Sequence, residues 1–291
     1  MNSFEILTKI YKPYKVTVKG NVKIFNSLCG NYVVKEKCDK DIRELYNYLL
    51  SRGFPYYPKL IEDNRSDVNV FEYIEDNSLD DEQKLMDLIN VLSLLHNKTS
   101  YFKEITNDKI KSIYEELLGR VLYIEESLNH LIIEYENSLF ISPSANLILN
   151  NSTKIFESLS FVKNEIEEWY KLSLDSNKIR VSLIHNNIKL EHYIKNENDY
   201  LISWENYKID SPVLDIVKLY KNVYLNMNFS ESLRTYMENF HLLESEKKLL
   251  FIMLILPDEL ILNDNELINV SIVRKYVDYV FKTEELVKNF Y

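Results

Sequence analysis

The sequence predicts an α+β protein, in which a β-rich N-terminal part precedes a larger and mostly helical part. Three observations lead to this prediction. Short β-prone runs separated by glycines fill the first third of the chain, and long amphipathic stretches fill most of the rest. A small cluster of strand-like segments interrupts the helical part at residues 180–204. With 46% hydrophobic residues among 291, the chain can bury a sizeable core.

The N-terminal elements follow from local pattern. A helix is predicted over residues 40–51, because Ile42, Leu45 and Leu49 share one face and Gly53 stands where the helix should stop. The predicted strands are residues 16–18, 22–25, 31–36, 59–62 and 68–74.

The C-terminal elements are mainly helices. The helix predicted over residues 79–96 has Ser78 as its N-cap, with Asp81 and Glu82 in its first turn. Residues 140–152 are the predicted loop in the middle of the chain. The further predicted helices are residues 105–138, 154–174, 213–225, 230–240, 245–256 and 266–289, and the predicted strands are residues 180–184, 193–195 and 201–204.

Composition narrows the function classes. The formal net charge of −10 disfavours binding to nucleic acid or to anionic membranes, which attract basic surfaces. The longest apolar run, Leu249–Leu256, is far shorter than the ~20 residues that span a bilayer. We also expect no secretory signal in Met1–Ile10, and free thiols at Cys29 and Cys38.

The segment Leu183–Tyr220 carries the most chemical information. It resembles the part of aminoglycoside phosphotransferases and choline kinases that runs H-G-D-x-x-x-x-N, then a hairpin, then an acidic metal-binding step. His185, the pair Trp204–Glu205, Pro212 and Asp215 match that frame. The resemblance implies a bilobal, protein-kinase-like fold. We expect an N-lobe at residues 1–76 and a helical C-lobe at residues 77–291, with the catalytic-loop hairpin at residues 183–205.

Three positions depart from the family pattern. Asn187 replaces the catalytic Asp, His192 replaces the metal-binding Asn, and Ser203 replaces the metal-binding Asp. A neutral amide cannot accept a proton as a carboxylate does. Imidazole is a poor ligand for Mg²⁺, which prefers charged oxygen. We therefore expect a degenerate catalytic site, with His185 as a structural residue and Glu205 as the candidate metal ligand.

The N-terminal part offers candidate nucleotide contacts, again through the resemblance. Lys35 resembles the phosphate-anchoring lysine, and Glu44 is its candidate ion-pair partner. Glu72 and Tyr73 lie in the segment that resembles the hinge between the lobes. The loop that would cover the nucleotide, residues 18–25, contains a single glycine, which is a weak cradle for phosphates.

Within the superfamily, several stretches resemble the spore-coat, CotS-like branch. They include LYNYLLSRGFPYYPKLI, FEYIED, LLHNKTSYF and LPDEL. The resemblance implies a role in coat assembly, with other spore-coat or cellular proteins as partners. We expect a cytoplasmic or spore-coat location and no contact with nucleic acid or membrane.

These observations leave three hypotheses. The first is a pseudokinase that acts as a scaffold, without a cofactor. The alternative is an ATP-dependent small-molecule phosphotransferase whose Mg²⁺ site is rebuilt around Glu205, with help from Glu191 or Asp210. ATP and Mg²⁺ are then its cofactors, and a hydroxyl or amino group is the acceptor. A metal-independent nucleotide binder lies between the two.

Overall fold

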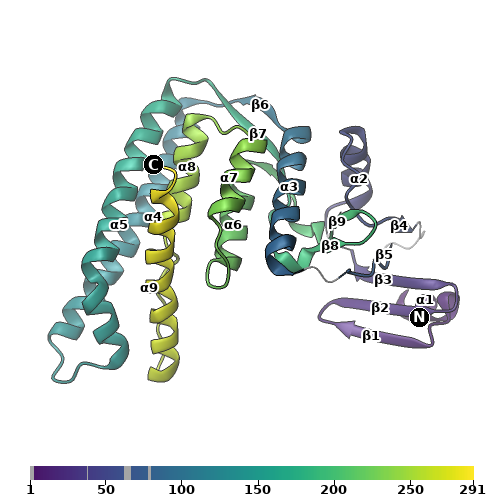
Figure 1. Ribbon diagram of the computed structural model, residues 1–291, viewed down its shortest axis with the longest axis horizontal. Coiled ribbons are helices and arrows are strands. Elements are labelled where there is room, and N and C mark those ends of the chain that lie inside the picture. The colour runs from purple at the N-terminus through teal and green to yellow at the C-terminus, as the bar shows by residue number, and fades with distance from the viewer. Residues whose placement is uncertain (1–2, 38, 62–66, 78–79) are drawn as a thin grey trace. The chain divides into compact units, whose positions relative to one another are not determined.

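The computed structural model describes residues 3–37, 39–61, 67–77 and 80–291, and it contains two compact units (Figure 1). The first unit is formed by Met1–Thr99 together with His185–Lys208. The second is formed by Ser100–Ile184 together with Ile209–Tyr291. The hairpin that carries the candidate site therefore belongs to the same unit as the N-terminal strands. The expected lobe boundary at residues 76 and 77 stays a prediction.

An antiparallel sheet forms the base of the first unit. Its strand order is β1-β2-β3-β5-β4, and its predicted strands are confirmed to within a few residues at their ends. Between the first two strands, Gly20 has a φ of 55°, which a tight two-residue hairpin requires and glycine adopts without strain. The strands are β1 (Lys15–Lys19), β2 (Val22–Ser27), β3 (Gly30–Glu36), β4 (Leu60–Ile61) and β5 (Val68–Glu72).

One face of this sheet is covered by helix α1 (Ser3–Tyr11), which is not among the predicted elements. Leu7 of α1 is fully buried in a cluster with residues of three strands. The strand residues of this cluster are Phe25, Val34, Val68 and Val70. Because side chains alternate across a strand, Lys35 next to Val34 lies on the opposite face.

Two helices, both predicted, and a β-hairpin complete the first unit. Helix α2 (Ile42–Ser51) begins at Asp41, whose side chain accepts a hydrogen bond from the Arg43 amide at 2.8 Å. Helix α3 (Asp81–Thr99) follows β5, and its predicted N-cap Ser78 lies outside the described residues.

The hairpin of β8 (Tyr193–Lys195) and β9 (Asp199–Leu201) is tied to α3. The Tyr193 hydroxyl lies 2.5 Å from Asp199 Oδ1 and 3.4 Å from Asp87 Oδ2 of α3.

The second unit is a helical assembly around one long helix. Helix α5 (Pro143–Leu174) packs against α4 (Asn107–Glu136), α8 (Glu244–Ile255) and α9 (Glu266–Lys288). Helices α6 (Val213–Val223) and α7 (Ser230–Asn239) are also as predicted. A small sheet of order β10-β7-β6 completes it, formed by β6 (Tyr101–Glu104), β7 (Lys178–Ile184) and β10 (Lys208–Asp210).

The loop predicted at residues 140–152 is wrong, because α5 already begins at Pro143. Ser142 is its N-cap, with a side chain that accepts a hydrogen bond from the Ala145 amide at 3.3 Å, and proline at the first helical position is favourable. Asparagine is a poor helix former, and three asparagines stand in this stretch. In the helix, the Asn151 side chain donates to the carbonyl of Leu147.

Two features bear on the environment of the chain. Within the described ranges, no helix combines the length and the apolar character that a membrane crossing needs. Cys29 is an exposed free thiol, whereas Cys38 lies outside the described residues.

Candidate functional site

Lys35 lies near the end of β3, on the sheet face opposite α1. In the register, Lys35 is opposite Val22 of β2 and Asn69 of β5. Lys19 of β1 is opposite Val22 and so lies on the same face. This face therefore carries two lysines in one cross-strand row, close to the hairpin turn.

The same face is lined by partly buried apolar side chains. Ile24 and Val33 are cross-strand partners one pleat away from the lysine row. Phe71 of β5 continues this row and is buried. The result is an apolar surface next to a basic edge, and this combination suits a ligand with a flat ring and an anionic tail. Ile24 and Val33 are not among the predicted site residues, although the alternation along β2 and β3 places them on the face of Lys35.

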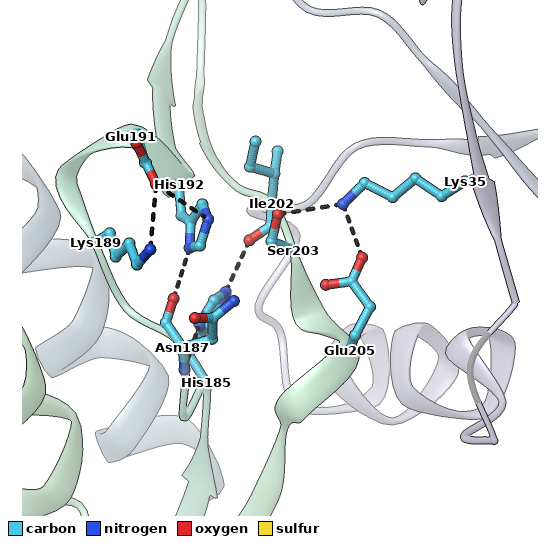
Figure 2. A network of polar contacts seen from close by, with 9 residues as sticks. All are labelled: Lys35, His185, Asn187, Lys189, Glu191, His192, Ile202, Ser203 and Glu205. Carbon is cyan, nitrogen blue, oxygen red and sulfur yellow. Dashed lines mark hydrogen bonds and ion pairs between the residues drawn. The ribbon is translucent and has the colours of Figure 1, made fainter. Parts of the chain in front are cut away.

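The Lys35 ammonium is held by two residues that follow the hairpin. It lies 2.7 Å from Glu205 Oε1 and 3.2 Å from Ser203 Oγ (Figure 2). These contacts join β3 to a segment about 170 residues further along the chain. The structure thus brings together three of the sequence-predicted positions: the lysine, the degenerate metal position and the remaining acid.

Electrostatics favours the ionised form of Glu205. Burial is the largest single influence and raises the pKa of this carboxyl, but the charge and hydrogen bond of Lys35, with a backbone hydrogen bond, together lower the pKa of Glu205 below its ordinary value. The Glu205 side chain is 38% exposed. Glu205 is therefore a charged carboxylate with access to solvent, as a site for a hard metal cation requires.

The segment around Ser203 has an unusual backbone. Ser203 has φ 66° and ψ 51°, in the left-handed region that non-glycine residues seldom adopt. Neighbouring anchors hold this conformation: Trp204 is buried, and its indole nitrogen donates to the Leu201 carbonyl at 2.8 Å. A rare conformation fixed by its surroundings is typical of functional positions.

His185 has the structural role that the sequence analysis expects. It is fully buried, and its Nε2 lies 2.8 Å from the carbonyl oxygen of Ile202. Its Nδ1 accepts a hydrogen bond from the Asn187 amide at 3.3 Å, so Nε2 carries the proton and donates it to Ile202. His185 therefore connects the loop that holds Asn187 to the segment that holds Ser203.

The loop after His185 turns through a second left-handed residue. Asn186 has a φ of 61°, at the position where the H-G-D pattern has glycine. Asparagine is, with glycine, among the residues that adopt this conformation most readily, so the backbone course of the loop is preserved. The Asn187 side chain makes no hydrogen bond to another residue that the structure describes.

His192 packs against the same loop. Its Nδ1 donates to the Asn187 carbonyl oxygen at 2.6 Å, and its Nε2 lies 3.9 Å from Glu191 Oε1 (Figure 2). Burial lowers the pKa of His192, although the bond to Asn187 acts in the opposite direction. His192 is therefore neutral near pH 7 and braces the loop.

The remaining sequence-predicted residues lie apart from this cluster. Glu44 is exposed on α2, and the ion-pair partner of Lys35 among the described residues is Glu205. Glu72 accepts a hydrogen bond from the Lys59 amide at 2.7 Å. The Tyr73 amide donates to the Asn31 carbonyl at 3.1 Å, and its side chain is 39% exposed.

Of the two further acids expected near a metal, Glu191 lies 3.4 Å from Lys189. Asp210 belongs to the other compact unit and accepts a hydrogen bond from the Ser211 amide.

Metal-binding capacity at this cluster rests on few donors. Across the residues that the structure describes, three or more His, Cys, Asp or Glu side chains do not gather into a metal-binding group. The donors present, the Glu205 carboxylate and the Ser203 hydroxyl, are both oxygen. Mg²⁺ is often bound through one or two carboxylates, with phosphate oxygens and water completing its shell. The donor set therefore fits Mg²⁺ when a nucleotide supplies the remaining oxygens.

Comparisons with known proteins rest on structure alone. No protein-family model matches the sequence, and no curated protein is similar to it in sequence. An aminoglycoside phosphotransferase from Alicyclobacillus acidocaldarius matches with a TM-score of 0.69 and 10% identity, over 95% of this chain and 92% of that one. A spectinomycin phosphotransferase bound to AMP matches with a TM-score of 0.55 and 13% identity, over 99% and 94%. A choline kinase from Streptococcus pneumoniae matches with a TM-score of 0.49 and 16% identity, over 98% of this chain and 97% of that one.

At these identities the comparisons show a shared fold. The chain has the mixed α+β, kinase-like fold of the aminoglycoside phosphotransferases, with an antiparallel N-terminal sheet and a helical C-terminal region. The predicted fold class is confirmed. The spore-coat branch and the loss of catalysis are finer predictions, which the comparisons leave open.

Proposed function

We propose that the chain is an ATP-dependent phosphotransferase that acts on a hydroxyl or amino group of a small molecule. The observation that carries this proposal is the contact of Lys35 with Glu205 and Ser203. A strand lysine and an ionised acid that meet next to an apolar sheet face are suited to bind phosphates and a metal beside a nucleotide ring. The shared fold with two named phosphotransferases supports the same proposal.

Each residue has a definite part in this function. Lys35, assisted by Lys19, attracts the phosphates of the nucleotide. Glu205, together with the Ser203 hydroxyl, holds Mg²⁺, which neutralises charge on the phosphate oxygens when it is bound. Ile24 and Val33 offer the apolar surface for the base. In the reaction, the acceptor's oxygen or nitrogen forms a bond to the γ-phosphorus, and the bond from that phosphorus to the β,γ-bridging oxygen breaks. ADP leaves with the bridging oxygen, and the acceptor's proton is released to solvent.

The absence of a carboxylate at position 187 slows this reaction without abolishing it. Phosphoryl transfer passes through a loose transition state, so positioning and charge neutralisation supply most of the catalysis. General-base catalysis typically contributes about 10²–10⁴-fold. We therefore expect turnover to be slower by roughly that factor than in an enzyme with Asp at the position of Asn187.

A second candidate function is an inactive, pseudokinase-type scaffold, in spore-coat assembly or elsewhere. Specific observations favour it: Asn187 is neutral, His192 braces the loop, and Glu205 is the one carboxylate beside Lys35 among the described residues. A scaffold of this kind needs a surface for protein partners rather than a nucleotide.

Thermal unfolding with ATP separates these functions. The proposed phosphotransferase is stabilised by several degrees with ATP and Mg²⁺ together, and Glu205→Ala abolishes this shift. An equal shift with and without Mg²⁺ would indicate a metal-independent nucleotide binder. No shift under either condition would leave the scaffold. Release of ADP in the presence of candidate amino alcohols then tests turnover.

A further inference from the structure

The second compact unit has an end where three helix termini meet. The turn between α4 and α5 lies beside the start of α9 (Figure 1). Glu266, the first residue of α9, accepts hydrogen bonds from the Ser144 amide and hydroxyl at 2.7 and 2.9 Å. Burial raises the pKa of Tyr135 near the end of α4, and the charges of Glu134 and Glu266 raise it further. Hydrogen bonds thus join the first turns of α5 and α9, and Tyr135 of α4 lies close enough to feel the charge of Glu266.

This end exposes an unusual concentration of large apolar side chains. Leu139 and Phe140 in the turn are 95% and 91% exposed, and Leu267 in the first turn of α9 is 84% exposed. We call this surface the apolar tip; it consists of Ile133, Leu139, Phe140, Ile141, Leu267 and Ile268, all of which are exposed. Single exposed apolar residues are ordinary, whereas a contiguous group marks an interaction surface.

The charges around the apolar tip have one sign. Neither residues 131–153 nor residues 255–273 contain a lysine or an arginine. Both segments contain acids, among them Glu134, Glu136 and Asp264. Anionic membranes attract apolar surfaces that are flanked by basic residues, so this rim disfavours them. Two copies of the tip placed face to face would also oppose acid to acid.

We propose that the apolar tip docks into another protein, at an apolar groove bordered by lysine or arginine residues. The apolar side chains supply the buried centre of the interface, and the acidic rim supplies steering and specificity. This inference is independent of the nucleotide site, because it rests on residues of the second compact unit alone. It also provides the protein-binding surface that a scaffold function requires.

Two designed peptides test the proposal. Each is an amphipathic helix with leucines on one face, and one has lysine flanks whereas the other has glutamate flanks. Fluorescence anisotropy on the full chain should show at least about tenfold tighter binding of the lysine peptide. The double variant Leu139→Ser/Phe140→Ser should weaken that binding at least about tenfold. The matched control is Leu28→Ser, which removes a residue that is 96% exposed on the first compact unit.

Further measurements decide which kind of molecule binds the apolar tip. A Glu134→Lys/Glu136→Lys variant should lose the preference for lysine flanks while its melting curve stays cooperative. Binding that is unchanged in the Leu139→Ser/Phe140→Ser variant, or absent for both peptides, would overturn the proposal. So would a dimer in sedimentation that this variant abolishes, since a second copy would then occupy the tip. Co-sedimentation with phosphatidylglycerol vesicles that depends on Leu139 and Phe140 would assign the surface to membranes instead.

Discussion

His192 shows how a residue at a metal-ligand position can take a structural role. Its imidazole donates to the backbone of Asn187 and is largely shielded from solvent, so a positive charge on the ring is unfavourable. The pKa of His192 is therefore lowered on folding, chiefly by burial. The loop around Asn187 is stabilised by a neutral ring, where the family pattern has a metal-binding asparagine.

This shift predicts a pH dependence of stability. In the unfolded chain His192 titrates near its ordinary pKa of 6.5, and in the fold it titrates below that value. As the pH falls from the unfolded towards the folded pKa, the unfolded state binds more protons, so stability is lost. The contribution is fully present above about pH 6.5. Urea unfolding between pH 7.5 and 5 should show this slope, and His192→Gln should flatten it.

The control for this measurement is His130→Gln, since His130 is exposed on α4. A slope that persists in His192→Gln at the wild-type value would assign the pH dependence to other groups.

Restoring the aspartate of the family pattern at position 203 tests the metal site. Its backbone is left-handed, a conformation that aspartate tolerates, and its side chain already lies beside Lys35. Ser203→Asp adds a second carboxylate next to Glu205, so we expect Mg²⁺ to strengthen ATP binding by about tenfold more than in the wild type. Ser203→Asn, which has the same shape without the charge, is the matched control. Equal metal dependence in the two variants would contradict this account of the site.

At the scale of elements, a buried ion pair connects β7 to α8. Arg180 Nε donates to Glu246 Oε1 at 2.9 Å, and its guanidinium also donates to the His241 carbonyl and lies over the Phe240 ring. The Glu246 side chain is 7% exposed, and it also accepts a hydrogen bond from the Leu243 amide, which caps α8. Removing one partner of such a pair leaves the other charge buried and unpaired.

Glu246→Ala should therefore lower the free energy of unfolding by about 3–5 kcal/mol. Glu246→Gln, which keeps one of the two acceptor oxygens and loses the charge, should cost less. Glu244→Ala on the exposed first turn of α8 is the control, and chemical denaturation measures all three. A loss for Glu246→Ala within about 0.5 kcal/mol of the control would show that the pair contributes little.

The elements that the sequence predicts are those with a strong period or clear punctuation. Helix α2 has a buried stripe and ends before Gly53. Strands β2 and β3 are β-prone runs set off by Gly20 and Gly30, so all three elements are predicted. Strand β6 was missed because its four residues are all exposed, which removes the alternation that identifies a strand. The start of α5 differs from the prediction although Ser142 and Pro143 mark it with an N-cap and a proline at the first helical position.

The candidate site was predictable in part for a similar reason. Motif spacing places Asn187, His192, Ser203 and Glu205 in one frame, and in the structure these residues lie on the two segments that flank the β8–β9 hairpin. The contact between Lys35 and Glu205 depends on how two distant segments pack, so local sequence could not choose between Glu44 and Glu205 as the partner. The left-handed backbone of Ser203 likewise lies between long-range contacts, those of Ile202 with His185 and of Ser203 with Lys35.

At the scale of the whole molecule, the two compact units carry different capacities. The first unit contains a sheet face with lysines, an apolar surface and an ionised acid, which together favour a nucleotide. The second unit is a helical assembly whose acidic end exposes the apolar tip. A phosphotransferase and a protein-binding surface can therefore coexist in this chain, because neither uses the residues of the other.

The central claim is that Lys35 and Glu205 form a metal-dependent nucleotide site. Isothermal titration calorimetry with ATP tests it most directly, with and without Mg²⁺. We predict one binding site, an affinity at least about tenfold higher with Mg²⁺, loss of that metal effect in Glu205→Gln, and loss of binding in Lys35→Met. Binding that is indifferent to Mg²⁺ and to both substitutions, or no binding in the wild type, would contradict the account.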